Sequence, residues 1–330
     1  MDKEIYDNSS KEFDVIALGE LLIDFTQSGI SAQGNGLFEA CPGGAPCNVL
    51  SMLQRLNKKT AFIGKVGRDS FGSLLKQALL QQGIDASQLF FDESIPTTLA
   101  FVHTMPDGDR DFSFYRKPGA DMMLREEEVE EAFIAKARLF HFGTLSMTHQ
   151  EIRRATKKAV RLAKKNGLLI SFDPNLRPPL WDTMQNARAQ MEYGLGMCDI
   201  LKIADNELCF LTGKEDYDEG IACLQRAYRI PLILLTMGKD GSRAYYKGSC
   251  IKADGFSCHT IETTGAGDTF FACVISYVLE HGLYDLTEPE LKEMLTFANA
   301  AAALVTTRKG ALRAMPQREE VERWIEEYQG

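Results

Sequence analysis

The sequence predicts an α/β protein in which a mostly parallel β-sheet is covered by helices on both faces, with a small β-sheet beside it. Three observations predict this class. Short apolar runs alternate with amphipathic helical runs over most of the chain, which is typical of a buried parallel sheet. Two stretches with strand character lack the intervening helices. The chain has 330 residues, which is long enough for one large α/β domain.

The strands and helices are expected to follow each other in chain order. The first helix shows why: Ala45, Val49, Met52, Leu53 and Leu56 recur at a spacing that places them on one helical face. We expect strands at 15–18, 61–63, 139–142, 168–172, 199–203 and 232–236, where short apolar runs occur. We expect helices at 45–56, 70–82, 152–163, 269–280 and 294–306.

Residues 21–41 and 97–117 interrupt this order. The first stretch is rich in Gly, Ser and Gln. The second is typical of a hairpin, with strands at 100–105 and 111–115 joined by a turn at 106–109. We expect the two stretches to form a small antiparallel sheet beside the main domain.

Composition excludes several classes of function. The net charge is -9 and no basic block stands out, so we expect no nucleic-acid partner. No apolar run approaches the roughly 20 residues of a membrane span, and residues 1–12 form a polar tail without a targeting signal. We expect residues 13–330 to form a single domain. The eight cysteines include no Cys-x-x-Cys pair, and Cys209, Cys223 and Cys273 are expected to be buried, reduced thiols in a cytoplasmic protein.

Residues 262–268, Glu-Thr-Thr-Gly-Ala-Gly-Asp, carry the strongest functional signal. Gly265, Ala266 and Gly267 allow a tight turn, and the first amides of the following helix point outward without partners. Asp268 places a carboxylate at the mouth of this anion site. Phosphoryl transfer needs both features, so the segment indicates a kinase. In isolation it could equally be a turn with a capping aspartate.

A second glycine pair stands at the entrance to the first helix. Gly43 and Gly44 expose backbone amides there, and Asn48 in the first turn offers a donor and an acceptor that suit a sugar hydroxyl. Asp24 follows the first buried strand, and the carboxyl ends of strands are where open α/β sheets bind ligands. An aspartate in this position can accept two sugar hydroxyls. A capped glycine loop and a solvated acid remain the alternatives.

Two further strand ends carry polar groups. After strand 168–172 the sequence Asp-Pro-Asn-Leu-Arg-Pro brings an acid, an amide and a guanidinium together, and Arg177 could grip a phosphate or a carboxylate. After strand 232–236 the small residues of 236–241 could line a nucleotide channel, or could form a hairpin turn. Asn299 is polar within an alanine-rich helix and is a candidate to face an adenine.

Other phosphoryl-transfer and metal motifs are absent from the sequence. It contains no Gly-x-x-x-x-Gly-Lys-Ser/Thr loop, no protein-kinase signature set and no His-Glu-x-x-His motif. The five histidines are scattered and are expected to be structural.

These segments, in this order, resemble the ribokinase-like carbohydrate kinase family of the PfkB type over residues 13–318. Gly43, Gly44 and Asn48 belong to a stretch similar to the N-terminal signature of the family, together with Gly64, Gly67, Asp69 and Gly72. Residues 264–268 are similar to its C-terminal signature. The stretches at 43–49, 114–121 and 172–178, with Leu180-Trp181, resemble fructokinases most closely.

The resemblance implies a Rossmann-like domain with a β-sheet lid formed by about 21–41 and 97–117. It implies Asp268 as the catalytic base, with the amides of Gly265, Ala266 and Gly267 as the anion hole. The expected sugar-binding residues are Asp24, Gly43, Gly44, Asn48 and Arg177. The expected ATP-binding residues are Thr236, Gly238, Gly241, Asn299 and Lys202, and Glu207 is expected to organise Mg²⁺ through water.

Two departures from the family pattern bear on the expected site. Ala204 stands where the family often has Asn, three residues before the Mg²⁺-organising Glu207. Glu262 stands where the family has an aspartate that helps to build a monovalent-cation site, so Glu262 and Thr264 are candidates for a K⁺ site.

We therefore expect an ATP-dependent fructokinase that makes fructose 6-phosphate, with a homodimer through the lids as the assembly that the family suggests. A 2-keto-3-deoxygluconate kinase or another ketose kinase is the alternative enzyme, because Arg116 and Arg177 could bind a carboxylate. A kinase-like scaffold or sensor that has lost catalysis is the alternative from another class.

Overall fold

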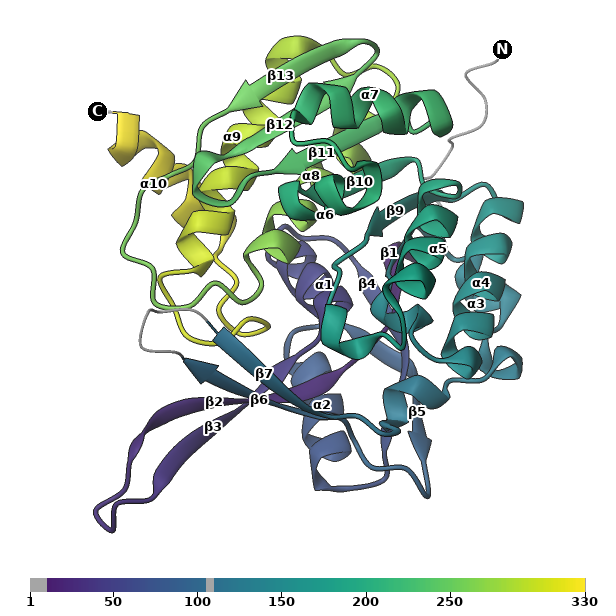
Figure 1. The fold of residues 1–330 in the computed structure, drawn as a ribbon, viewed down its shortest axis with the longest axis vertical. Helices are drawn as coiled ribbons and strands as arrows, with labels where there is room; N and C mark the ends of the chain where they lie inside the picture. The colour runs from purple at the N-terminus through teal and green to yellow at the C-terminus, as the bar shows by residue number, and fades with distance from the viewer. Residues whose placement is uncertain (1–10, 105–109, 330) are drawn as a thin grey trace.

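The computed structural model describes residues 11–104 and 110–329 (Figure 1). Its main sheet has nine strands in the order β13-β12-β11-β10-β9-β8-β1-β4-β5. These strands are β1 (Phe13–Leu18), β4 (Thr60–Gly67), β5 (Asp85–Asp92), β8 (Ala137–Gly143), β9 (Leu169–Asp173), β10 (Ile200–Ala204), β11 (Leu232–Thr236), β12 (Ser242–Tyr246) and β13 (Ser249–Ala253). All neighbours are parallel except β11 with β12 and β12 with β13, so the predicted fold class is confirmed.

Helices cover both faces of this sheet, as the alternation of apolar residues along its strands requires. In β1, Val15 and Ala17 belong to one hydrophobic core, and Ile16 and Leu18 belong to the other. The first core is shared with α1 (Ala45–Arg55), α2 (Ser70–Gln81), α8 (Ala266–His281), α9 (Glu288–Val305) and α10 (Arg318–Gln329). The second is shared with α3 (Glu131–Ile134), α4 (Gln150–Lys165), α5 (Met184–Leu195), α6 (Asp205–Thr212) and α7 (Tyr217–Ala227).

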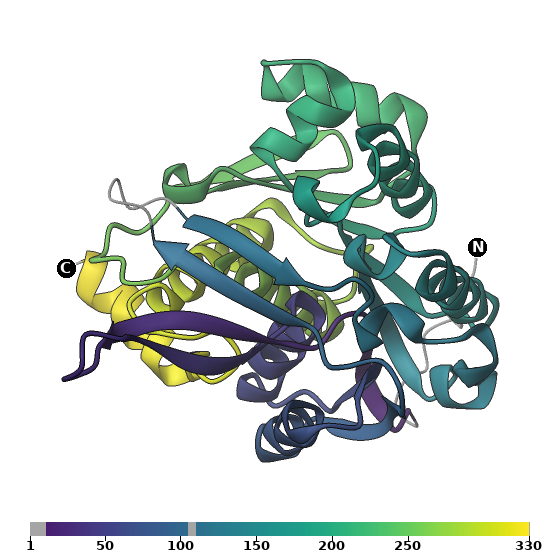
Figure 2. The same cartoon turned by 60° about the horizontal axis from the view of Figure 1, so that its bottom comes forward.

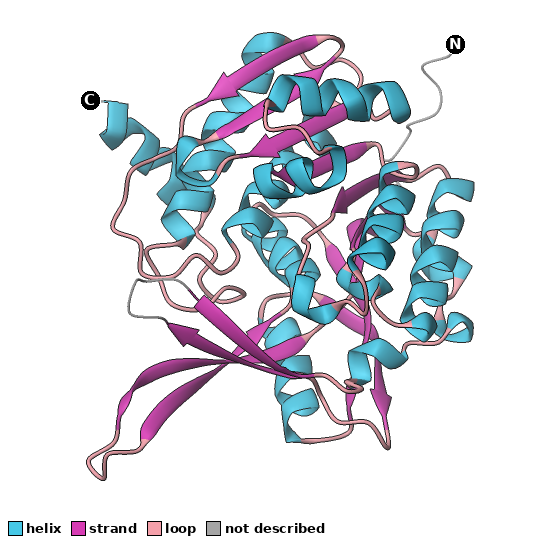
Figure 3. Ribbon diagram, in the orientation of Figure 1, coloured by secondary structure: helices cyan, strands magenta, loops and turns pink. Residues whose placement is uncertain are grey.

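The four remaining strands form a separate sheet, the lid, in the order β3-β2-β6-β7. They are β2 (Leu22–Ile30), β3 (Gly36–Gly43), β6 (Leu99–Thr104) and β7 (Arg110–Tyr115), and Figures 2 and 3 show them running together away from the main sheet. Phe25 of β2 stacks on Phe101 of β6 with the ring centroids 4.8 Å apart. The lid is antiparallel except for β2 with β6, which are parallel, so the expectation of an antiparallel sheet is wrong for this central pair.

Several details differ from the sequence-based expectations. The expected turn at 106–109 lies outside the described residues, as does most of the expected tail at 1–12. Strands β5 and β13 were not expected from the sequence. Cys273 is buried, but Cys209 is exposed and Cys223 is partly exposed, so the prediction of buried thiols is wrong for Cys209. Among the helices of the described residues, none combines the length and the apolar character that a membrane span requires.

Candidate active site

A cleft of about 810 Å³ opens along the carboxyl edge of the main sheet, between the lid, the loops after β9, β10 and β11, and the first turn of α8. This is the edge at which open parallel sheets bind ligands. The cleft brings together most of the candidate residues named from the sequence. Those that line it are Asp24, Gly44, Asn48, Arg177, Lys202, Glu207, Thr236, Gly238, Thr264, Gly265, Gly267 and Asp268. Gly43, Gly241, Glu262, Ala266 and Asn299 are not among the lining residues.

Helix α8 begins earlier than the sequence indicated. Gly265 is its N-cap, with φ 83° and ψ -2°, a left-handed conformation that favours glycine. Ala266, Gly267 and Asp268 therefore form the first turn of the helix and not a turn before it. In the described part of the chain the amides of Gly265 and Gly267 donate to no backbone carbonyl, and Ala266 makes only a long bond of 3.3 Å to the Thr263 carbonyl. The helix dipole and these amides favour an anion at this end of the cleft.

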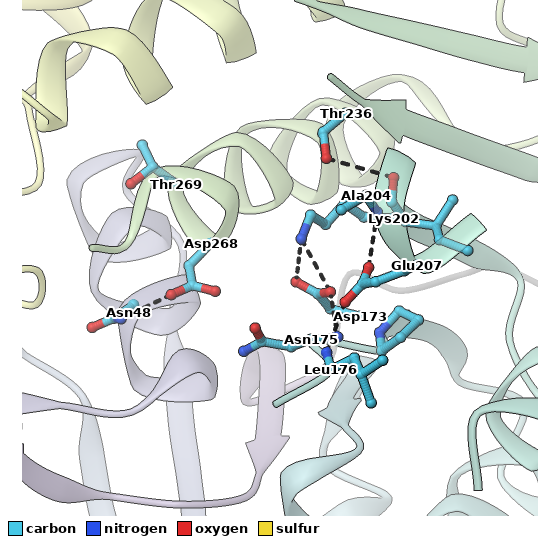
Figure 4. A network of polar contacts seen from close by, with 12 residues as sticks. Asn48, Asp173, Asn175, Leu176, Lys202, Ala204, Glu207, Thr236, Asp268 and Thr269 are labelled. Carbon is cyan, nitrogen blue, oxygen red and sulfur yellow. Dashed lines mark hydrogen bonds and ion pairs between the residues drawn. The ribbon is translucent and has the colours of Figure 1, made fainter. Parts of the chain in front are cut away.

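Asp268 is almost fully buried at this helix start. The Asn48 Nδ2 of α1 donates to its Oδ2 over 2.8 Å, and Figure 4 shows the two side chains facing each other. Within the described residues its second oxygen, Oδ1, accepts no hydrogen bond. Burial and the negative charge of Asp173 raise the pKa of Asp268 to about 6, although the Asn48 hydrogen bond and the charges of Lys202 and Arg177 lower it. A carboxylate with a free oxygen and this pKa is suited to accept a proton near neutral pH.

A buried ion pair lies across the cleft from this carboxylate. Lys202 of β10 donates from Nζ to both oxygens of Asp173, at the end of β9, over 2.9 and 3.1 Å (Figure 4). Both side chains are less than 10% exposed. The ammonium also faces α8, because a Cβ built on Gly267 would lie only 3.1 Å from Nζ. Burial alone lowers the pKa of Lys202, but the charges of Asp173, Glu207 and Asp268 outweigh it, so the amine stays protonated.

Glu207 joins two of the loops that line the cleft. Its Oε1 accepts the amide of Leu176 at 2.7 Å, and its Oε2 accepts the amide of Ala204 at 2.8 Å (Figure 4). The second bond caps α6, since Ala204 has no side chain that could do so. Both oxygens therefore fix backbone, and each keeps a further lone pair that could accept another hydrogen bond.

The structure places Asp24 differently from the sequence-based expectation. It lies within lid strand β2, opposite Cys41 of β3, and not in a loop at the end of a main-sheet strand. Gly43 makes room for it, because any Cβ at Gly43 would collide with Asp24 Oδ2. Burial and the charge of Glu262 raise the pKa of Asp24 to about 7, and the charge of Arg177 lowers it. Asp24 lines the cleft from the lid, and its role in binding a sugar stays a prediction.

Glu20 is a cleft residue that the sequence reasoning missed. Its Oε1 accepts the amide of Ala45 at 2.9 Å, which fixes the start of α1, and burial raises its pKa to about 7. Gly44 has φ 131°, and a Cβ there would collide with the Glu20 carbonyl. An acidic residue directly after a buried strand was the available signal.

Arg116 is not free to bind a ligand. Its guanidinium pairs with Asp121 at 2.7 Å and also donates to Thr148 Oγ1 and to the Leu145 carbonyl, at 3.0 and 3.1 Å. Arg116 and Asp121 are both buried. Arg177, in contrast, is exposed at the cleft and forms no ion pair with a described residue.

At the opposite end of the cleft, Thr236 and Gly238 line the surface, whereas Gly241 and Asn299 lie behind it. The expectation that Asn299 presents its amide to a ligand is not met. Its Oδ1 accepts from Ser242 Oγ at 2.9 Å, and its Nδ2 donates to the carbonyls of Ala253 and Asp254 at 3.0 Å. The amide is thus used to join α9 to β12 and β13. Gly241 has φ 90° and packs against the Ala253 carbonyl, where a Cβ would not fit.

Glu262 is buried near the start of α8, and its Oε2 accepts the Gly310 amide at 2.9 Å. Thr264 lines the cleft beside it. Among the described residues no group of three or more His, Cys, Asp or Glu side chains could hold a metal ion by itself.

Comparison with known proteins agrees with this geometry. Residues 13–318 match the pfkB family of carbohydrate kinases, and the chain belongs to that family. It is 40% identical to "Probable fructokinase-2" from Arabidopsis thaliana over 304 residues, which is 92% of each chain. Its structure superposes on a fructokinase from Xylella fastidiosa with bound ATP, with a TM-score of 0.87, 31% identity, and 96% and 99% of the two chains covered. It also superposes on a double mutant of the fructokinase from Vibrio cholerae O395, bound to fructose, ADP and a potassium ion, with a TM-score of 0.85, 29% identity, and 96% and 99% covered.

Proposed function

We propose that this protein is an ATP-dependent fructokinase that converts D-fructose and ATP into fructose 6-phosphate and ADP. One observation carries the proposal: Asp268 presents an unbonded carboxylate oxygen to the cleft at the start of α8, beside amides that have no backbone partner. The family, and relatives named as fructokinases, support the choice of reaction and sugar.

In the proposed reaction Asp268 Oδ1 accepts the proton of the terminal hydroxyl as that oxygen attacks the γ-phosphorus. The bond between the γ-phosphorus and the bridging oxygen breaks, and ADP leaves with the electron pair. Charge spreads over the phosphoryl oxygens in the transition state. The amides of Gly265, Ala266 and Gly267 stabilise this charge, and the long Ala266 bond to Thr263 is weak enough to yield. Closure of the lid would exclude water and limit ATP hydrolysis.

The sugar is proposed to lie between the lid and α1. Asp24 accepts sugar hydroxyls from the lid, and Gly43 and Gly44 allow the close approach. Asn48 already donates to Asp268, and its buried Oδ1 has no partner among the described residues, so it can accept a hydroxyl. Arg177 closes the open side of the site.

The nucleotide is proposed to lie along Thr236 and Gly238, with its phosphates directed to Lys202 and the start of α8. Gly241 and Asn299 support this surface from behind by fixing the hairpin of β12 and β13. Mg²⁺ would enter with the ATP phosphates and neutralise their charge. Glu207 fits a role through water, because both of its oxygens already accept amides.

Three further features belong to the proposal. Glu262 and Thr264 are proposed to form a K⁺ site that supports the anion hole.

A homodimer through the lids is proposed from the exposed apolar side chains Leu37, Phe38 and Tyr115 on the lid strands. Light scattering that finds only a monomer would contradict this assembly. The chain is proposed to work in the cytoplasm.

A 2-keto-3-deoxygluconate kinase is the second candidate, because the exposed guanidinium of Arg177 could bind a carboxylate. The structure weakens this candidate, since Arg116, the other cation named from the sequence, is taken up by Asp121. A catalytically inactive scaffold would not require the glycines or the unbonded oxygen of Asp268.

The test is sugar-dependent ADP release from Mg²⁺-ATP with fructose, ribose, glucose, fructose 6-phosphate and 2-keto-3-deoxygluconate, with K⁺ varied against Na⁺ at fixed ionic strength. We expect fructose to give the highest kcat/KM and K⁺ to raise it. Preference for the keto acid would move the substrate and keep the chemistry. A folded protein that binds ATP but turns over none of the sugars would contradict the proposed function, and a flat response to K⁺ would remove the cation site.

A further inference from the structure

Asp173 has no role in the reaction described above, yet its buried carboxylate lies directly behind a cleft residue and is fully bonded. It is 3% exposed and accepts both Lys202 hydrogen bonds, and its Oδ1 also accepts the Asn175 amide at 3.1 Å. Burying two charges is costly unless the pair is well oriented, so a pair kept in this position needs an explanation beyond stability.

The position of the Lys202 amine explains why this buried ion pair is present. Lys202 Nζ also faces the first turn of α8 near Gly267, and its positive charge lowers the pKa of Asp268 in that turn. Glu207 also acts on it from α6, but the two oxygens of Glu207 hold the amides of Leu176 and Ala204. Within the described residues Asp268 forms no ion pair, and only Asn48 bonds to it. Asp173 thus holds the amine, and Asp268 in the neighbouring helix turn is left without an ion pair among the described residues.

We propose that Asp173 is a positioning residue that holds Lys202 away from Asp268 and directed at the phosphoryl-transfer site. The inference rests on the proposed function, since it gives the amine a phosphoryl group to face. In this arrangement Lys202 contributes positive charge beside the amides of α8, and the free oxygen of Asp268 stays available for the sugar proton. Without Asp173 the ammonium would pair with Asp268 and block it.

The test is a double-mutant cycle on kcat with Asp173→Asn, Lys202→Met and both together. We expect Asp173→Asn alone to lower kcat about tenfold or more, because the base is blocked, and to raise the KM for ATP less than Lys202→Met does, because the amine stays in the cleft. In the Lys202→Met background the same substitution should have almost no further effect. Equal losses of kcat in both backgrounds would overturn the proposal.

The pH profile of kcat/KM gives a readout that a general loss of structure would not move. The acid limb reports protonation of Asp268, which faces Asp173, Lys202, Arg177 and Asn48. Asp173→Asn should shift that limb to lower pH, because a repelling charge is replaced by a pairing ammonium, and Lys202→Met should shift it to higher pH. Shifts in the same direction, or none, would contradict the inference. The exposed pair Lys214–Glu219, with the same 2.9 Å separation, supplies the control variants Lys214→Met and Glu219→Gln, which should leave the profile unchanged.

Binding measurements separate this inference from the proposed function. Lys202→Met should lower the affinity for ADP about tenfold and leave the affinity for adenosine unchanged, because only ADP carries phosphates. Adding Asp268→Asn should raise the affinity for ADP more in the Asp173→Asn background than in the wild type. In that background it releases the Lys202 amine from its pair with Asp268. These arms need no sugar, so a protein that phosphorylates none of the sugars can still support or overturn the role of Asp173. If Asp173→Asn does not fold, the double variant Asp173→Leu with Lys202→Met serves in its place, because it replaces the buried ion pair by apolar groups. We expect this double variant to fold and to have the same kcat as Lys202→Met.

Discussion

At the scale of single residues, the site is governed by how carboxylates are partnered. Both oxygens of Glu207 accept hydrogen bonds from backbone amides, and both oxygens of Asp173 accept hydrogen bonds from the Lys202 ammonium. Asp268 accepts one hydrogen bond from Asn48, and its other oxygen accepts none among the described residues. Only the last arrangement leaves a carboxylate able to accept a proton from a bound substrate. Burial raises its pKa to about 6, so it stays ionised at neutral pH but loses its charge just below.

Asn48→Ala tests this partnering. The Asn48 hydrogen bond stabilises the ionised form of Asp268, so its removal should raise the pKa of Asp268 further. A base works only when deprotonated, and the acid limb of kcat/KM should therefore move to higher pH, with a larger loss of activity at pH 6 than at pH 8. The control is Ser51→Ala on the same helix, whose hydroxyl donates to the Leu312 carbonyl away from the site. An acid limb that stays in place would show that Asn48 does not act on the base.

At the scale of elements, the cleft depends on helix starts and on the contacts that hold them. Gly265 in the left-handed conformation begins α8 so that its first amides face the cleft, and Glu20 fixes the first turn of α1. Helix α9 contributes no group to the cleft lining. Its Asn299 instead satisfies a hydroxyl and two carbonyls of the β12–β13 region, and so supports the nucleotide end from behind.

We therefore expect Asn299→Ala to lower the stability of the protein more than its affinity for ADP. It leaves Ser242 Oγ and the carbonyls of Ala253 and Asp254 without this partner, and it should lower the free energy of unfolding by about 1–3 kcal/mol. Denaturant unfolding measures the change, and Thr296→Ala on the same helix is the control, because its hydroxyl bonds only to the Lys292 carbonyl one turn away. A variant as stable as the wild type that nevertheless loses ADP affinity would show direct contact with the nucleotide.

At the scale of the whole molecule, two hydrophobic cores hold the main sheet between helices, and the lid is a separate sheet that joins the first core through Ile23 of β2. The periodicity of the sequence was sufficient for the fold class, because strands such as β11, with four consecutive apolar residues before Thr236, lack the spacing of an amphipathic helix. Strand β5 was missed because it lies at the edge of the sheet, where only Ala86 and Leu89 of its residues are buried, and its first half has no continuous apolar run. Contacts across the fold decided what local patterns could not: the placement of Asp24 on the lid, the use of Asn299 for support, and the pairing of Arg116 with Asp121.

The measurement that tests the central claim most directly is the rate of fructose-dependent ADP release by Asp268→Asn. Asparagine keeps the shape of the side chain but cannot accept the proton, so we expect kcat to fall by about 10²–10⁴-fold while the affinities for fructose and ADP change little. A folded Asp268→Asn variant that keeps kcat within about tenfold of the wild type would contradict the role of Asp268 as the base.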